Sequence, residues 1–111
     1  MPFKNTGTLL LDLEGRIAFA STFFCDLVGI ERDEVVGMSW FDFVFREDVR
    51  SAWELFVTTN LPHANPLRFR LRRRDGSAVW TDIQASHLQV PDGKAYAVTA
   101  TITPVNSKPL N

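Results

Sequence analysis

Arginine is the residue type whose spacing first suggests chemistry in this sequence. The stretch LRFRLRRRDGSAVWTDIQAS, residues 67–86, contains five arginines within seven residues: Arg68, Arg70, Arg72, Arg73 and Arg74. Guanidinium groups bind phosphate, so such a row could hold nucleic acid. However, only alternate residues of a strand share a face, Asp82 stands opposite in the predicted hairpin, and the net charge of the chain is -1. We therefore interpret the row as a solvated strand face and expect no nucleic-acid binding by this domain.

Cysteine and histidine give no pattern typical of a redox or metal site. Cys25 is the single cysteine, and it stands mid-helix without Cys, His or Lys nearby in sequence, which favours a buried, unreactive thiol. His63 lies in a proline-rich loop and His87 near a predicted strand end, and this spacing is not that of metal ligands. By parity His87 could also face an interior pocket. We expect no metal.

Catalytic patterns are also missing from the sequence. It has no nucleophile elbow, phosphate-binding glycine loop, close carboxylate pair or Ser-His-Asp arrangement. We therefore expect a protein that is not an enzyme. A small α+β enzyme remains a third hypothesis, and it would require an inward-facing acid or a buried, titrating His87.

Aromatic residues are numerous, and most are expected in a core. A subset could instead line a pocket for a small apolar or aromatic ligand. The predicted walls of this pocket are Leu27, Phe41, Trp53, Phe56, Phe69, Ile83, Tyr96 and Val98. A core filled by phenylalanine would give the same residue pattern, so both alternatives stay open.

Trp80 is predicted to lie on the sheet face opposite the helices, because it alternates along its strand with Val79 and Ile83. The apolar patch expected on that face comprises Leu10, Ala18, Trp80, Ala95 and Ala97. Such a patch on an exposed sheet requires a cover. A second copy of the chain, a flanking segment and a merely half-exposed tryptophan are the alternatives.

Composition is that of one ordinary globular domain. The chain has 111 residues, 45% of them hydrophobic and 23% charged, which suffices for one core. No apolar run approaches the roughly 20 residues that cross a bilayer, so we expect no membrane insertion by this segment. The single cysteine excludes an internal disulfide, and we expect a cytoplasmic protein. The predicted domain is 7–105, with 1–6 and 106–111 as linker ends of a longer protein.

Local signals predict the elements that must position these residues. The turn at Gly15 separates two short strands, whose core face would comprise Leu9, Leu11, Leu13, Ile17 and Phe19. Ser21 and Ser39 are expected to cap helical turns, and Gly29 to end the first helix. A period of 3.6 then predicts a helix from Glu47 to about Thr59.

The second half changes to the period of two that is typical of strands. Two Asp-Gly pairs, at 75–76 and 92–93, predict tight hairpins joining three strands. The order is strand, strand, three helices and three strands. This order predicts an α+β fold, a five-stranded antiparallel sheet with short helices on one face.

This order, together with four motifs, resembles a PAS domain over about residues 7 to 105. The motifs are LDLEGRIAFAS, LVGIERDEVVGMSWFDFVFREDV, LRRRDGSAVWTDIQAS and the closing TIT. Three family features are absent. Ser21 stands where an asparagine is common, FRED replaces His-Pro-Glu-Asp, and the closing Asp-Ile-Thr lacks its acid, so the salt bridge of that acid is not carried over.

Cofactors of the family are not expected in this chain. Flavin-binding relatives have a cysteine after a glycine like Gly37, and this chain has Met-Ser-Trp-Phe there. Haem-binding relatives use a histidine of the long helix, and none stands between Glu47 and Thr59. The resemblance therefore implies neither a covalent flavin adduct nor haem.

The resemblance implies a non-catalytic sensory domain within a histidine kinase, a cyclic-dinucleotide enzyme or a transcription regulator. It would sense a small ligand, form a homodimer, or do both, and pass the signal to an effector domain of the same chain. The signal would leave through Thr101, Ile102 and Thr103. The alternative is a ligand-free dimerisation or docking module.

Overall fold

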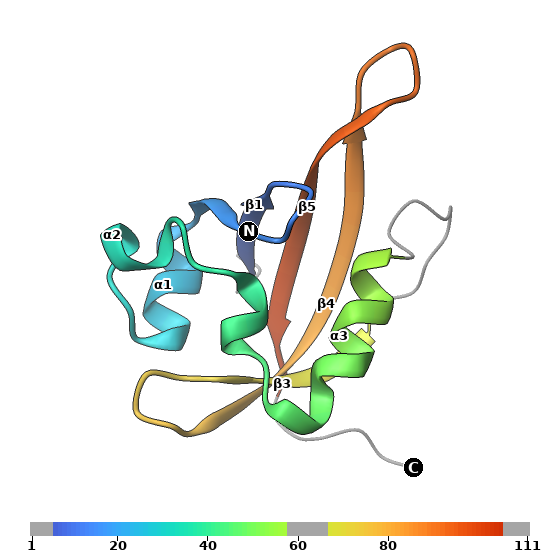
Figure 1. Cartoon of the computed structure of the whole chain (residues 1–111). Helices are drawn as coiled ribbons and strands as arrows, with labels where there is room; N and C mark the ends of the chain where they lie inside the picture. Colours follow the sequence, from blue (N-terminus) through green and yellow to red (C-terminus); the bar gives the residue numbers. More distant parts are fainter. Residues whose placement is uncertain (1–5, 58–66, 106–111) are drawn as a thin grey trace, which may run out of the picture.

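The computed structural model describes residues 6–57 and 67–105 (Figure 1). Two strands come first, helical segments follow, and three strands end the chain, which confirms the predicted order. The elements are β1 (Gly7–Leu11), β2 (Ile17–Ala20), α1 (Thr22–Val28), α2 (Arg32–Val35), the 3₁₀ helices η1 (Trp40–Phe43) and η2 (Arg46–Asp48), α3 (Val49–Val57), β3 (Leu67–Arg72), β4 (Ala78–Gln89) and β5 (Ala95–Pro104). The predicted helix end at Thr59 lies outside the described residues.

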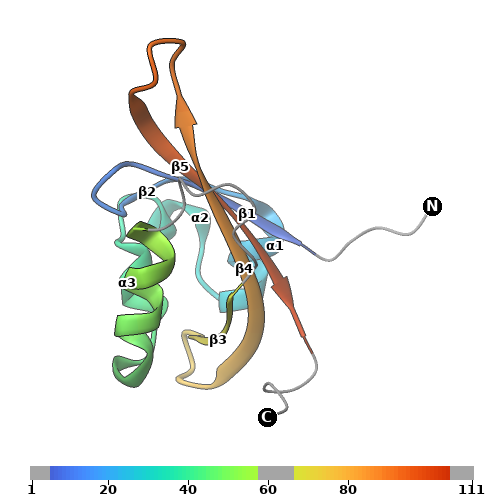
Figure 2. The same cartoon turned by 90° about the vertical axis from the view of Figure 1, so that its right-hand side faces the viewer.

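The five strands form one antiparallel sheet in the order β2-β1-β5-β4-β3. Figure 2 shows the helical segments on one side of this sheet. The first and last strands are neighbours, with Gly7 opposite Ile102. Along the described part of the chain, no helix has the length and apolar character that spanning a membrane requires.

The predicted caps explain where the short helices begin and end. The Ser21 hydroxyl accepts the Phe24 amide and begins α1, and the Ser39 hydroxyl accepts the Phe41 amide and begins η1. Gly29 ends α1 with a φ of 77°, a left-handed conformation that costs other residues free energy. These predictions are confirmed.

The core lies between the inner face of the sheet and the helical segments. Its fully buried side chains include Leu9, Ile17, Ile83 and Ile102 from the strands. Phe24 meets Phe43 edge to face, with ring centroids 5.5 Å apart, so α1 and η1 pack over the sheet through aromatic contacts.

A bulge in the first hairpin changes which side chains face the core. Leu10 pairs with Phe19, whereas Leu11 pairs with Ile17, so Ala18 is an extra residue in β2. Phe19 is therefore 46% exposed on the outer face, and Ala20 is buried in its place. Leu13, in the turn, is 48% exposed. The predicted core positions of Phe19 and Leu13 are wrong.

The hairpin of β4 and β5 extends beyond the rest of the sheet (Figure 1). Among the described residues, β1 pairs with β5 as far as Val98, and β3 pairs with β4 as far as Ile83. Near the tip, Leu88 pairs with Ala97 and Gln89 with Ala95, so Tyr96 is the extra residue of a second bulge.

Candidate functional site

The inner face of the sheet encloses a small apolar cavity. Its volume is about 10 Å³, roughly the space of one water on this measure. The lining side chains are all apolar: Leu9, Leu11, Trp40, Ile83, Ala85, Ala100 and Ile102. Only a molecule of about the size of water fits into this cavity unless the lining side chains move.

Three aromatic rings connect this cavity to the surface. Trp40 is 5% exposed and forms one wall, and its ring centroid lies 5.1 Å from that of Phe41. The Phe41 ring lies 5.9 Å from Trp53, which is 54% exposed. The turn between β1 and β2 packs on these rings, because a Cβ atom added at Gly15 would lie 3.2 Å from Cε2 of Phe41. Displacement of Trp40 and Phe41 would enlarge the cavity.

The predicted pocket walls are only partly assembled by the structure. Ile83 lines the cavity, Val98 is fully buried, and Leu27 and Phe41 pack at the edge of the core. Tyr96, on the extended hairpin, is 57% exposed, and Trp53 is 54% exposed. Neither lines this cavity, so the structure does not place them as pocket walls. The side chains of Phe56 and Phe69 lie outside the described part of the structure.

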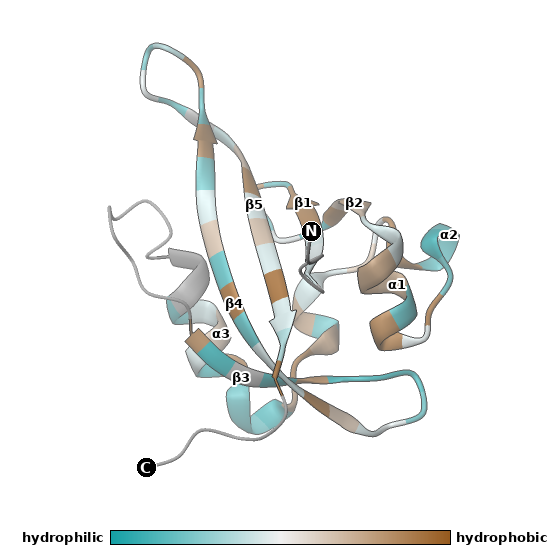
Figure 3. Ribbon diagram, turned by 180° about the vertical axis from the view of Figure 1, so that it is seen from behind, coloured by the Kyte–Doolittle hydropathy of each residue, from teal (hydrophilic) through white to brown (hydrophobic). Residues whose placement is uncertain are grey.

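Figure 3 views the sheet from its outer face, which is the second candidate site. Apolar side chains of this face gather in an upper cluster, whereas Trp80, whose cross-strand neighbour is Arg70, lies apart from it. The upper cluster comprises Leu10, its cross-strand neighbour Phe19, and the pair Leu88 and Ala97. Leu10 and Leu88 are half-buried, and Ala97 is 7% exposed. Trp80 lies eight residues from Leu88 along β4, roughly 26 Å at about 3.3 Å per residue.

Polar residues separate the upper cluster from Trp80. Register places Ser86 beside Thr99 and Gln84 beside Thr101. The hydroxyls of Ser86 and Thr99 are 3.2 Å apart. Trp80 and Leu10 therefore do not form the single patch that strand parity predicted.

Of the other residues predicted for this face, Ala18 is exposed at the bulge, and the Ala95 side chain is outside the described part. Phe19 and Leu88 were missed by sequence reasoning. Phe19 faces outward because of the bulge, which has no signal in the local pattern. Leu88 could have been predicted, because the strand alternation that places Trp80 on the outer face also places Leu88 there.

The arginines of β3 form ion pairs at the sheet edge. Arg68 makes two hydrogen bonds to Asp82 across the strands, at 2.6 and 3.0 Å. Hydrogen bonding to Arg68 lowers the pKa of Asp82. Arg70 reaches Asp48 at 3.0 Å and Glu47 at 3.1 Å, and its guanidinium lies 4.6 Å from the Phe45 ring centroid. Because β3 is an edge strand, Arg70 also connects the sheet to η2.

The predicted exit for a signal lies at the end of β5. Ile102 is buried, and its neighbours Thr101 and Thr103 are exposed. The Thr103 hydroxyl lies 3.3 Å from that of Thr6, so the start of β1 and the end of β5 lie side by side.

Other candidate groups are distributed without forming a site. Cys25 is buried in α1, His87 is half-buried in β4, and His63 lies outside the described residues. Within residues 6–57 and 67–105, acids, histidines and the cysteine form no group suited to a metal ion.

Comparison with known proteins gives a family for nearly the whole sequence. Residues 5–105 match the profile described as the PAS domain. No curated protein gives a significant match.

Solved structures match the fold at low sequence identity. The PAS-B domain of Cycle from Drosophila melanogaster has a TM-score of 0.80 and 17% identity, over 89% of this chain and 99% of that chain. A PAS domain of an HTR-like protein from Haloarcula marismortui has 0.74 and 19%, over 90% and 81%. A PAS domain from Colwellia psychrerythraea has 0.82 and 12%, over 91% and 86%. At these identities the likeness concerns the fold alone.

Proposed function

Because this chain belongs to the PAS domain family, whose members are sensory and interaction modules, we propose that it forms a homodimer through the outer face of its sheet. In this role it is a non-catalytic, cytoplasmic part of a longer signalling protein. The host would be a histidine kinase, a cyclic-dinucleotide enzyme or a transcription regulator.

The observation that supports dimerisation is the exposure of large apolar side chains on a sheet face without helices. Phe19 is 46% exposed, and Leu10 and Leu88 beside it are half-buried. Burial of such side chains contributes roughly 25 cal/mol per Å² of apolar area. A second copy presents the same cluster, so a two-fold contact matches apolar surface with apolar surface.

Phe19→Asp is expected to weaken this dimer without unfolding the domain, because a charge would have to be buried in the contact. The control is Tyr96→Asp, which places the same charge at a similarly exposed aromatic position on the hairpin. Sedimentation equilibrium of the three proteins measures the dimer constant. Equal dimerisation of Phe19→Asp and wild type would contradict this interface.

Trp80→Asp tests whether the dimer contact lies at the upper cluster or at the Trp80 end of the outer sheet face. The upper cluster alone predicts little change in association for this variant. Loss of the dimer in Trp80→Asp, with the dimer kept in Phe19→Asp, would assign the contact to the Trp80 end of the sheet.

A second candidate function is ligand sensing in the inner cavity. It is favoured by the wholly apolar lining and by the aromatic series that leads to the surface. The related PAS-B domain of Cycle is described with bound ethylene glycol, and a tryptophan-to-alanine variant of it with bound glycerol. For this chain we propose a small apolar or aromatic ligand that displaces Trp40 and Phe41.

Ala85→Phe tests this pocket, because the larger ring would fill the cavity from one wall. Native mass spectrometry of the purified chain, recorded with its visible absorption spectrum, is expected to show an added small-molecule mass that this variant loses. Ala18→Phe, at the exposed bulge, is the control. An added mass that persists in Ala85→Phe, or no added mass in wild type, would contradict the pocket.

Either function requires a route to the effector domain. We propose that a shift of the sheet passes through Ile102 to Thr103 and into the following segment. A ligand or partner drives such a shift only if it binds one arrangement of the sheet more tightly than the other.

A further inference from the structure

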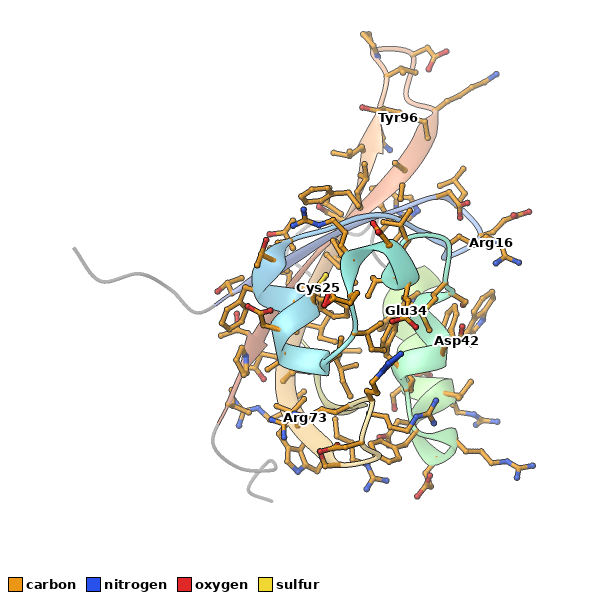
Figure 4. The ribbon with its side chains drawn as sticks, turned by 90° about the vertical axis from the view of Figure 1, so that its left-hand side faces the viewer. Arg16, Cys25, Glu34, Asp42, Arg73 and Tyr96 are labelled. Atoms are coloured by element: carbon orange, nitrogen blue, oxygen red, sulfur yellow. The ribbon has the colours of Figure 1, made fainter. Side chains whose placement is uncertain are left out.

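A hollow with a mixed lining lies between α2, η1 and the turn that joins β3 to β4. Its volume is about 450 Å³, within the range of ligand pockets. Ile30, Met38 and Phe43 form its apolar floor. Figure 4 labels two acids of its rim, Glu34 and Asp42, on the same side of the molecule as Arg73.

Two arginines of the rim are held by neighbouring groups. The Arg74 amide donates to the Val28 carbonyl at 2.8 Å, and its guanidinium pairs with Glu34 at 2.7 Å. Arg72 donates to the backbone carbonyl of Asp42 at 2.5 Å. Thus the β3–β4 turn is fixed against the helical segments, and the hollow keeps its shape without a ligand.

Arg73 differs from these two, because its guanidinium lacks an ion pair among the residues that the structure describes. Its one side-chain hydrogen bond, to the Ser77 hydroxyl, is long at 3.5 Å. The nearby Asp75 carboxylate accepts the amide and hydroxyl of Ser77, at 2.9 and 2.6 Å. These bonds, chiefly the one from the hydroxyl, lower the pKa of Asp75, and the nearby positive charge of Arg73 lowers it further without a hydrogen bond between the two side chains. Arg73 borders both this hollow and the adjoining one beside Gly29.

The charges of the rim favour a single carboxylate over a chain of phosphates. Glu34 and Arg74 neutralise each other, which leaves Arg72 and Arg73 facing one acid, Asp42. A polyphosphate or nucleic acid would approach two rim carboxylates and a chain of net charge -1. One carboxylate with an adjacent apolar group matches one available guanidinium above an apolar floor.

We propose that this hollow binds a segment of a partner protein in which an aspartate or glutamate stands beside a large apolar side chain. The carboxylate pairs with Arg73, and the apolar side chain lies on Met38 and Phe43. None of the residues of the hollow belongs to the upper cluster proposed for dimerisation, so this docking site is independent of the dimer.

The test is a titration of the ¹⁵N-labelled chain followed by NMR, with three acetylated and amidated pentapeptides. The sequences Ala-Glu-Leu-Glu-Ala, Ala-Gln-Leu-Gln-Ala and Ala-Glu-Ala-Glu-Ala separate the carboxylate from the apolar group. We expect shifts of the Ile30, Met38 and Arg73 amides with the first peptide, and binding weaker by about fivefold with each of the others.

Arg73→Gln should weaken binding of the first peptide by a similar factor, whereas Arg68→Gln, which removes an arginine of the neighbouring strand β3, should not. The spectra also report whether each variant is folded. Equal binding of the glutamine peptide, shifts confined to other surfaces, or no binding at millimolar concentration would overturn the proposal. Tighter binding of inorganic triphosphate than of the first peptide would overturn it in favour of a phosphate ligand.

Discussion

At Gly29 a single backbone angle determines how α1 ends. Its φ of 77° is left-handed, and an added Cβ would lie 3.7 Å from that of Arg74, an ordinary contact. Gly29→Ala should therefore cost about 1–2 kcal/mol of unfolding free energy from the backbone alone. Urea denaturation measures the loss. Gly29→Asn should lose less, since asparagine tolerates this conformation, and an Ala variant as stable as wild type would contradict the backbone argument.

Asp82 should make the stability of the domain depend on pH. Hydrogen bonding to Arg68 lowers its pKa in the folded state, so its contribution is present above the ordinary Asp pKa and is lost as pH falls through the folded value. Asp82→Asn should cost up to about 1 kcal/mol at pH 7, because the pair is partly exposed. The difference from wild type should begin to shrink below about pH 4 and disappear once the pH is below the lowered pKa of folded Asp82.

Denaturation of both proteins across pH tests this expectation. Arg68→Gln should give the same profile, and the double variant should lose little more than either single one. A difference that stays constant down to acid pH would show that Asp82 acts through packing instead of charge.

At the residue scale the sequence predicted what depends on neighbours in the chain. Ser21, Gly29 and Ser39 were assigned correctly, because a cap needs only the adjoining turn. Phe19 and Tyr96 were not, because each lies at or beside a bulge, and a bulge depends on how two strands pair. One extra residue reverses every later side chain of a strand.

Among the elements, α1 depends on Ser21 more than η1 depends on Ser39. The Ser21 hydroxyl accepts both the Phe24 amide, at 3.4 Å, and the Thr8 amide of β1, at 2.9 Å. The Ser39 hydroxyl accepts the Phe41 amide alone among the described contacts, at 3.3 Å. Ser21→Ala should cost about 1–2 kcal/mol, and Ser39→Ala about 0.5 kcal/mol.

Thermal or urea unfolding of the two variants gives the comparison. The larger loss for Ser21→Ala follows from its second partner in the neighbouring strand. If both variants lose the same amount, the bond to Thr8 contributes nothing measurable.

The end of the β4–β5 hairpin should be the least stable part of the sheet. From 88 to 97 the two strands pair only with each other in the described structure, whereas Val98 to Ile102 have partners on both sides. Two-stranded ribbons are marginally stable in water. Backbone amides of 88–97 should exchange with solvent about 100-fold faster or more than those of 98–102. Hydrogen-exchange NMR of the monomer, obtained by dilution or with Phe19→Asp, measures this, because the proposed dimer would cover Leu88 and Ala97. Uniform protection in the monomer would contradict the prediction.

For the elements as a group, alternation, caps and Asp-Gly turns predicted the order of the strands and helical segments. They did not predict that Trp40–Phe43 and Arg46–Asp48 are 3₁₀ helices, so the long helix begins at Val49 and its predicted start at Glu47 is wrong. The extension of the hairpin past its neighbours was not predicted, because strand length in the sequence does not say where the adjacent strands end.

In the whole molecule, the fold could be predicted and the sites only in part. The sheet with helices on one face follows from the order of elements, and so does the exposure of an outer face. The separation of the upper cluster from Trp80 on that face depends on the register across four strands. The hollow beside Arg73 brings together α2, η1 and a distant turn, and no local pattern contains such a contact.

The adjacency of β1 and β5 determines how this domain would respond to mechanical tension. The start of β1 and the end of β5 form one end of a strand pair, where the hydroxyls of Thr6 and Thr103 are 3.3 Å apart. A force that pulls these two strand ends apart acts first on the residue pair Gly7 and Ile102. It then acts on each following pair of the ladder, as far as Leu11 and Val98. The bonds would break one after another instead of all together, so the strands should peel apart at low force.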